Sequence, residues 1–230
     1  MVTLLLCCYM LHMATFIDRT LAAGRYTFQA EAEKLIVPDV ILKLQPLPTS
    51  SFLEIGCGPG LLISAIEPLV ASCTGIDTDK QVALARSATN ARLIAGRFED
   101  INLNERFDRI LIYAVIQCLP SIPAVESFIL KAASLLSPQG RLLVGDIPNS
   151  DTKKAFLASE AGAAFHANWL ASNHSPPPVN DHQGVGSFTS AEIHSLMADC
   201  RERGMLAYLL PQPADLPFGH TREDLLIVRS

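Results

Sequence analysis

The chain has 230 residues, of which 49% are hydrophobic and only 18% are charged. This length suits one domain with its own core, and the composition excludes an intrinsically disordered chain. A formal net charge of −5, with no tract of clustered lysines and arginines, excludes a phosphate backbone as the main partner, so no nucleic acid is expected.

The first residues, "MVTLLLCCYMLHMATF", are strongly apolar. They lack the basic start of a secretion signal and are short for a membrane span, so we predict a buried N-terminal helix or an over-long start. The six cysteines form no C-x-x-C pair, which favours reduced core residues over a disulfide framework or a metal site. We therefore expect a cytoplasmic protein with no membrane partner.

Short apolar runs alternate with helix-like segments from residue 51 to residue 147. Strands are predicted at 51–56, 73–77, 92–96, 107–114 and 141–147. Helices are predicted between them, from Leu61 to Ile66, from Lys80 to Arg92 and over an apolar stripe from Val125 to Leu136. Apolar strands separated by helices indicate a parallel sheet that is covered on both faces.

The pattern changes after Ile147. Residues 151–170 are predicted to be helical, and the polar, Pro-rich stretch 172–188 is long enough to predict a lid or a substrate loop. Thr189 or Ser190 is expected to cap another helix, and two last strands are predicted at 205–211 and 224–230. Nicotinamide-binding folds usually finish with another parallel strand, so this closing pair is unlike them.

The stretch "EIGCGPG" places Gly56, Gly58 and Gly60 between a strand and a helix. Such a turn lets the backbone approach a ligand closely and presents free N–H groups to it. A dinucleotide fingerprint would need a small residue at Leu61, and a Walker loop would need a Gly-Lys-Ser/Thr sequence that does not follow. The spacing therefore argues against an NAD-dependent oxidoreductase and against a Walker-type site.

Five segments, in this order, resemble class I S-adenosylmethionine-dependent methyltransferases of the small-molecule type. They are "FLEIGCGPG", "TGIDTD", "AGRFEDI", "FDRILIYAVIQCL" and "LLSPQGRLLVGDI". The resemblance implies an α/β fold with a Rossmann-like, seven-stranded, mostly parallel sheet, helices on both faces and a final antiparallel strand. It also implies S-adenosylmethionine as the cofactor and a small-molecule acceptor as the partner.

The resemblance makes the whole chain, 1–230, a single methyltransferase domain. We expect an N-terminal helical segment at 1–50 and an S-adenosylmethionine-binding core at 51–147. An acceptor-side insert or lid is expected at 148–190, followed by a closing helix and strand pair at 191–230.

The resemblance also gives the cofactor's groups their partners. Glu54 is expected to face the ammonium, Asp77 to accept from the ribose hydroxyls, and the carbonyl of Tyr113 to meet the ammonium. Phe98 is expected to lie over adenine and to offer its backbone N–H. The predicted cofactor-binding residues are Glu54, Gly56, Cys57, Gly58, Gly60, Asp77, Thr78, Phe98 and Tyr113.

Cys57 and Arg97 are two unusual residues within these motifs. Cys57 has no base beside it in the sequence, so we predict a small filler and not a nucleophile. Many members of the family carry an acid where Arg97 stands, and Glu99 or Asp100 is the candidate to replace it.

No general base is identified from the sequence. The candidates are Asp146, at the end of the fifth strand, and His182 and His220, in segments that cover the acceptor pocket in this fold. The fourth strand is followed by "AVIQ" and not by the Asn/Asp-Pro-Pro-aromatic signature, which counts against a nucleic-acid amino group as acceptor.

Two functions remain open. The first is methyl transfer to an oxygen or nitrogen of a small or medium-sized acceptor, sugar-like or another metabolite. The second is a non-catalytic S-adenosylmethionine-binding protein that acts as a regulatory or structural subunit. The sequence does not predict the oligomeric state.

Overall fold

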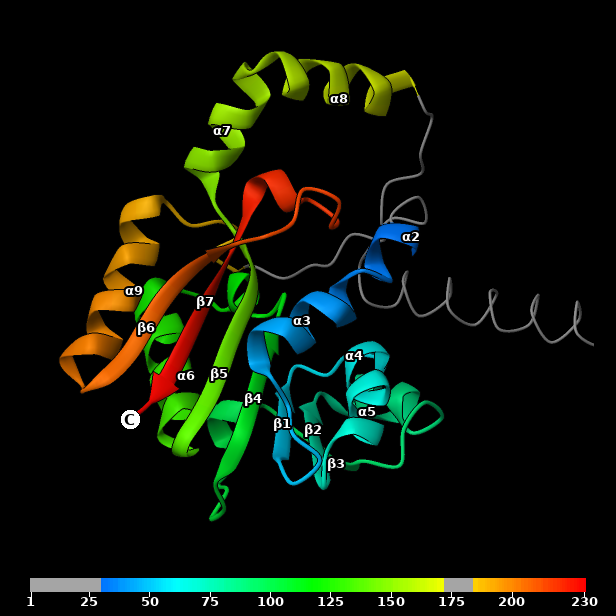
Figure 1. The fold of residues 1–230 in the computed structure, drawn as a ribbon, viewed down its shortest axis with the longest axis vertical. Helices are drawn as coiled ribbons and strands as arrows, with labels where there is room; N and C mark the ends of the chain where they lie inside the picture. Colours follow the sequence, from blue (N-terminus) through cyan, green and yellow to red (C-terminus); the bar gives the residue numbers. More distant parts are fainter. Residues whose placement is uncertain (1–29, 172–183) are drawn as a thin grey trace, which may run out of the picture.

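The computed structural model describes residues 30–171 and 184–230 (Figure 1). The strands are β1 (Ser51–Ile55), β2 (Ser72–Asp77), β3 (Arg92–Ala95), β4 (Phe107–Tyr113), β5 (Leu136–Pro148), β6 (Met205–Pro211) and β7 (Arg222–Arg229). The α-helices are α2 (Ala30–Glu33), α3 (Ile36–Leu44), α4 (Leu61–Ile66), α5 (Asp79–Ala85), α6 (Ile122–Ser134), α7 (Ser150–Ala158), α8 (Glu160–Ala171) and α9 (Ser190–Glu202). Short 3-10 helices, marked η, are η2 (Glu67–Leu69), η3 (Phe98–Asp100), η4 (Ile116–Cys118) and η5 (Gly219–Thr221).

The described strands form one seven-stranded sheet in the order β3-β2-β1-β4-β5-β7-β6. Strands β1 to β5 pair in parallel, whereas β7 is antiparallel to both of its neighbours, β5 and β6. The predicted fold class, a mostly parallel sheet with a final antiparallel strand, is therefore confirmed. The carboxyl ends of the parallel strands meet at one edge, where ligands of open α/β sheets bind.

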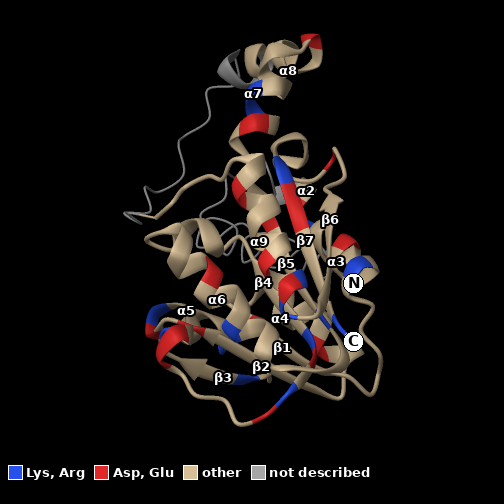
Figure 2. Ribbon diagram, turned by 90° about the vertical axis from the view of Figure 1, so that its left-hand side faces the viewer, with Lys and Arg blue, Asp and Glu red and all other residues tan. Residues whose placement is uncertain are grey.

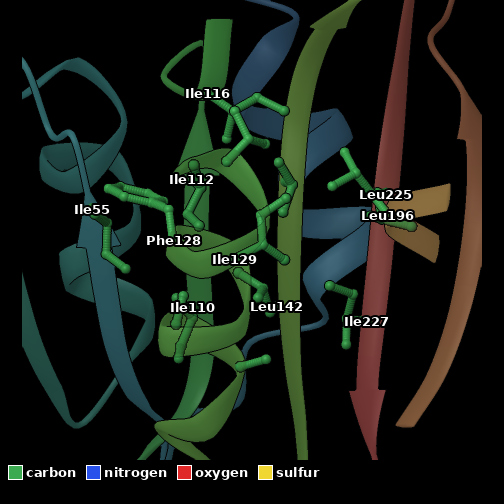
Figure 3. Close-up of a cluster of buried hydrophobic side chains, with 14 of the residues drawn as sticks. Ile55, Ile110, Ile112, Ile116, Phe128, Ile129, Leu142, Leu196, Leu225 and Ile227 are labelled. Atoms are coloured by element: carbon green, nitrogen blue, oxygen red, sulfur yellow. The ribbon is translucent and has the colours of Figure 1, made fainter. Parts of the chain in front are cut away.

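Two hydrophobic clusters cover the two faces of the sheet. On one face, Phe128 and Ile129 of α6 and Leu196 of α9 pack against strand residues such as Ile112 and Leu142 (Figure 3). On the other face, the apolar side of α3 and the buried isoleucines of α4 pack against β1, β4 and β5. Burial on both faces explains the continuous apolar character of the central strands.

The predicted helix over 151–170 is in fact two helices, α7 and α8, which project beyond the carboxyl ends of the strands (Figures 1 and 2). Ser159 interrupts the predicted helix. Its extended backbone ends α7, and its hydroxyl accepts from the N–H of Gly162 at 3.1 Å. The closeness of the two helices also requires Gly162, because a Cβ there would lie 1.9 Å from the carbonyl oxygen of Phe156.

Two helix boundaries differ from their predictions. The helix predicted from Lys80 to Arg92 is α5, which ends at Ala85. The carboxylate of Glu67 accepts from the Thr89 hydroxyl at 2.5 Å and from the N–H of Asn90, and these bonds hold that stretch in a turn. Leu136, predicted on a helix, instead begins β5.

Both ends of the predicted insert 148–190 meet at the carboxyl edge. Asn149 caps α7 and donates to the side chains of Ser190 and Glu223, while the N–H of Phe188 donates to the carbonyl of Pro148 at 2.9 Å. Most of the predicted N-terminal segment, residues 1–29, and the candidate His182 lie outside the described residues. Among the helices of the described ranges, none combines the length and apolar character needed to span a bilayer.

Candidate functional site

The glycine-rich loop after β1 has the backbone that its glycines predict. Gly56, Gly58 and Gly60 have φ values of 80°, 52° and 89°, in the left-handed region that favours glycine. A Cβ at Gly56 would lie 2.3 Å from Val115, whereas a Cβ at Gly58 would meet no atom within 4 Å. The loop is therefore packed against the protein at Gly56 and open at Gly58, where a ligand has room.

Glu54 lies beneath this loop near the end of β1, and its side chain is only 2% exposed. Burial, and then the nearby charge of Asp77, raise the pKa of Glu54 to about 8. Its Oε2 atom is buried and has no hydrogen-bond partner among the described residues. A buried carboxylate oxygen without a donor is costly, so this position favours a ligand that brings a cationic donor.

Asp77, at the end of β2, ties the loop to the second strand. Its Oδ2 accepts from the N–H of Gly58 at 2.7 Å, and its Oδ1 accepts from the N–H of Thr78 at 2.6 Å. A carboxylate has about four acceptor positions, so both oxygens can still accept from hydroxyls of a ligand. The structure thus brings Glu54, Asp77, Thr78 and the open part of the loop together.

Cys57 points into the protein and not toward this opening. Its side chain is buried, and its Sγ would lie 3.0 Å from a Cβ added at Gly75 of β2. Burial, and then Glu54 and Asp77, raise the pKa of the Cys57 thiol. A thiol that is held protonated is a poor nucleophile, which supports the prediction of a small filler.

Phe98 differs from its prediction in the placement of its ring. The side chain is 3% exposed and packs edge-on against Phe128, with the ring centroids 5.0 Å apart. The ring therefore packs in the core, and almost none of its surface is left for contact with a ligand. What Phe98 can offer to adenine is its backbone.

The predicted replacements for the missing acid at position 97 lie on the surface. Arg97 is exposed, and its guanidinium donates to Glu99 at 2.9 Å. Asp100 is exposed as well. A carboxylate paired with a neighbouring guanidinium is a weak candidate for accepting from an adenine amino group.

The end of β4 and the end of β5 are linked through β7. The ring of Tyr113 lies against Gly145, where a Cβ would be 2.5 Å from the ring. Its hydroxyl lies 3.4 Å from the side-chain nitrogen of Gln212, which donates to Asp224 at 2.9 Å. Asp224 also accepts from the backbone N–H of Asp146 at 2.9 Å.

Asp224 is completely buried and is paired with a cation from α3. Its Oδ2 lies 2.6 Å from the ammonium of Lys43, which lies at the same distance from Asp39. Burial raises the pKa of Asp224, and Lys43 opposes this effect. No motif in the sequence points to Lys43, Gln212 or Asp224, because partners this far apart in the chain leave no local pattern.

The two described candidates for a base have different surroundings. Asp146 is 2% exposed, has a left-handed φ of 60°, and has an oxygen 3.5 Å from Nε of Arg222. His220 is exposed, and its ring is stacked on Phe156 with centroids 4.4 Å apart and an interplanar angle of 8°. Asp146 thus lies inside a network of charged groups, whereas the imidazole of His220 is accessible.

Metal ligands do not gather at this edge. In residues 30–171 and 184–230, His, Cys, Asp and Glu side chains nowhere form a group of three that could hold a metal ion.

Comparison with known proteins identifies the family. A methyltransferase-domain family model matches residues 53–144. A ubiquinone biosynthesis O-methyltransferase from Paramagnetospirillum magneticum is 30% identical over 184 residues, which cover 77% of this chain and 68% of that protein. The chain belongs to the class I S-adenosylmethionine-dependent methyltransferase family.

A second relative is also named ubiquinone biosynthesis O-methyltransferase. The protein from Methylobacterium nodulans is 30% identical over 155 residues, which cover 64% of this chain and 57% of that protein. The chain spans about half to two thirds of the length of the curated relatives that it matches.

Solved methyltransferase structures share the fold. Magnesium protoporphyrin IX methyltransferase from Synechocystis PCC 6803, with bound SAH, has a TM-score of 0.59 at 15% identity, covering 88% of this chain and 85% of that one. An N-methyltransferase from Bradyrhizobium japonicum WM9 has a TM-score of 0.59 at 16% identity, covering 86% and 97%. At such identities the likeness concerns the fold alone.

Proposed function

We propose that the chain binds S-adenosylmethionine at the carboxyl edge of β1, β2 and β3 and transfers its methyl group to a small or medium-sized acceptor. The observation that carries the proposal is the buried Oε2 of Glu54, which has no partner in the described part of the chain and lies beneath a loop that is open at Gly58. A cationic ammonium satisfies this oxygen, and the methionine and ribose portions occupy the space over Gly58.

The chain's own residues have separate tasks in this proposal. Glu54 and the carbonyl of Tyr113 hold the ammonium, Asp77 and Thr78 hold the ribose, and the backbone of Phe98 faces adenine. Bound S-adenosylmethionine supplies a methyl group that is already activated by the positive sulfur. The protein's contribution is then mainly alignment of the acceptor with that methyl group and exclusion of water.

The favoured acceptor atom is a hydroxyl oxygen. Two relatives at 30% identity are named ubiquinone biosynthesis O-methyltransferases, which supports oxygen over nitrogen. Transfer to a hydroxyl benefits from a base that removes its proton. We propose His220 for this role ahead of Asp146, because the Asp146 carboxylate is buried beside Arg222. His182 and a sugar-like acceptor stay predictions.

The alternative function is an S-adenosylmethionine-binding subunit without turnover. Arg97, where many members carry an acid, and the pairing of Asp146 with Arg222 favour this alternative. A cytoplasmic location and the absence of nucleic-acid and membrane partners stay predictions.

The test is a calorimetric titration with S-adenosylhomocysteine, followed by incubation with methyl-labelled S-adenosylmethionine. The acceptors are 3,4-dihydroxybenzoate, as a hydroxyl probe, and a metabolite extract. We expect binding and label transfer, with transfer reduced in His220→Ala. Failure of S-adenosylhomocysteine to bind contradicts both functions, whereas binding without transfer to any compound favours the subunit.

A further inference from the structure

Lys131, on α6, donates all three of its hydrogen bonds to the backbone of one turn. Its Nζ lies 2.8 Å from each of three carbonyl oxygens, those of Phe98, Glu99 and Ile101. A lysine ammonium has three N–H donors, so these bonds use all of them. The ammonium therefore holds the η3 turn, Phe98–Asp100, by its main chain.

A second contact from α6 holds the same turn. Phe128 lies three positions before Lys131, on the same side of the helix, and packs against the Phe98 ring. The Lys131 Nζ also lies 4.9 Å from the centroid of that ring. One helix face thus holds both the side chain and the backbone of Phe98.

The turn follows β3 at the same edge of the sheet as Glu54 and Asp77. Glu54 lies near the end of β1, Asp77 ends β2, and the turn follows β3, the next strand in the sheet. The N–H of Gly96 donates to the carbonyl of Asp77 at 2.9 Å, which joins the two strand ends. A ligand with its ammonium at Glu54 and its ribose at Asp77 therefore has its base near the turn.

The backbone of the η3 turn, and not its side chains, is the part that can recognise the base. The Phe98 ring is buried, and the Arg97 guanidinium is paired with Glu99. Adenine N1 accepts a hydrogen bond, whereas hypoxanthine carries a hydrogen at N1. A backbone N–H held in a fixed position distinguishes these bases, because it faces an acceptor in one and a donor in the other.

We propose that Lys131 is a positioning residue for the adenine end of the cofactor site. It fixes the η3 backbone so that the Phe98 N–H points at adenine N1, and it thereby sets the selectivity for adenine. The inference rests on the proposed function, since it concerns a residue that acts on S-adenosylmethionine through the turn.

The test compares Lys131→Met with the parent by calorimetry, using S-adenosylhomocysteine and S-inosylhomocysteine. We expect the parent to favour the adenine ligand, and Lys131→Met to lose about tenfold in affinity for it and most of its preference over the inosine ligand. Lys153→Met, which removes an exposed lysine on α7, is the matched control and should change neither value. Amide hydrogen exchange should rise over 97–102 in Lys131→Met and stay unchanged over β4.

Each outcome has one meaning. If the parent does not bind S-adenosylhomocysteine, the proposed function fails, and this inference fails with it. If the parent binds and Lys131→Met retains its preference for adenine, the inference alone is overturned, even if both affinities fall together. Should Lys131→Met not fold, Lys131→Gln replaces it: a neutral side-chain amide has only two N–H donors for three carbonyls, so unchanged selectivity there also overturns the inference.

Discussion

Buried charged groups at the two halves of the sheet's carboxyl edge differ in whether the protein supplies their partners. At β1 and β2, the Glu54 carboxylate has an oxygen without a partner in the described chain, next to a loop with open space. At β5 and β7, Asp146 lies beside Arg222, and Asp224 is paired with Lys43. The difference suggests that the first half is completed by a ligand, whereas the second half is completed by the protein itself.

Removing the cation of the second half should have the largest effect on stability. Lys43→Met leaves Asp39 and Asp224 buried without their shared partner, which should lower the free energy of unfolding by about 3–5 kcal/mol. Denaturant unfolding measures this loss. The double variant Lys43→Met/Asp224→Asn removes both charges of the pair and should recover part of it.

Lys43→Met should leave the affinity for the cofactor unchanged. Titration of the folded variant should give the parent's affinity for S-adenosylhomocysteine, since Lys43 lies in the half that the protein completes. A large loss of affinity in the folded variant would show that the two halves are not separable.

Asp77→Ala tests the first half. This change should weaken cofactor binding by about 1–3 kcal/mol, because hydrogen bonds to a charged group are lost, and it should leave the fold intact. Calorimetry measures the affinity, and circular dichroism checks the fold. Glu202→Ala, which removes an exposed acid of α9, is the control. Equal affinities of Asp77→Ala and the parent would mean that the ribose lies elsewhere.

Glu54 makes the free protein sensitive to pH. Its pKa is raised from 4.5 to about 8 by burial and by Asp77, so the folded protein holds a proton that the unfolded chain releases. The free energy of unfolding should therefore fall as the pH rises from 4.5 toward 8, by up to about 1.4 kcal/mol per pH unit.

Ligand binding should respond to the same proton in the opposite direction. A cationic ammonium needs the ionised carboxylate, so affinity for S-adenosylhomocysteine should rise with pH up to about 8, the pKa of Glu54. Unfolding curves and titrations between pH 5.5 and 8, at about half-unit steps, measure both slopes. Glu54→Gln should flatten them, and slopes that persist in this variant would assign the proton to another group.

Gly58→Ala should have the smallest effect on stability. Gly58 and Gly204 both have a left-handed φ, and a Cβ added at either position meets no atom within 4 Å. Both alanine variants should therefore lose about 1 kcal/mol of stability. Only Gly58→Ala should also lose cofactor affinity, because its methyl group enters the space assigned to the ligand; equal affinities in the two variants would place the ligand elsewhere.

The sequence predicted the elements whose signals are local. Each of the first five strands contains a short apolar run, and alternate glycines give the loop after β1 its left-handed backbone. The boundaries failed where a distant residue decides the structure. Glu67 shortens α5 by binding Thr89 and Asn90, a contact that no helical pattern contains.

The candidate site shows the same limit. Glu54 and Asp77 follow from the motif, and the structure places them together. The buried ring of Phe98 depends on Phe128 of α6, and the pairing of Lys43 with Asp224 joins residues 181 positions apart. Such contacts exist only after the sheet has formed, so one sequence cannot reveal them.

The position of β7 has a consequence for biosynthesis. This strand comes last among the described elements, yet it lies between β5 and β6 and carries Asp224. On the ribosome, β1 to β5 and the glycine loop can be assembled while β7 is still being translated. The ion pair with Lys43 must wait for it, and until then β5 has an unpaired edge that can join another chain. The β5–β7–β6 part of the sheet is therefore the last part of the sheet to form.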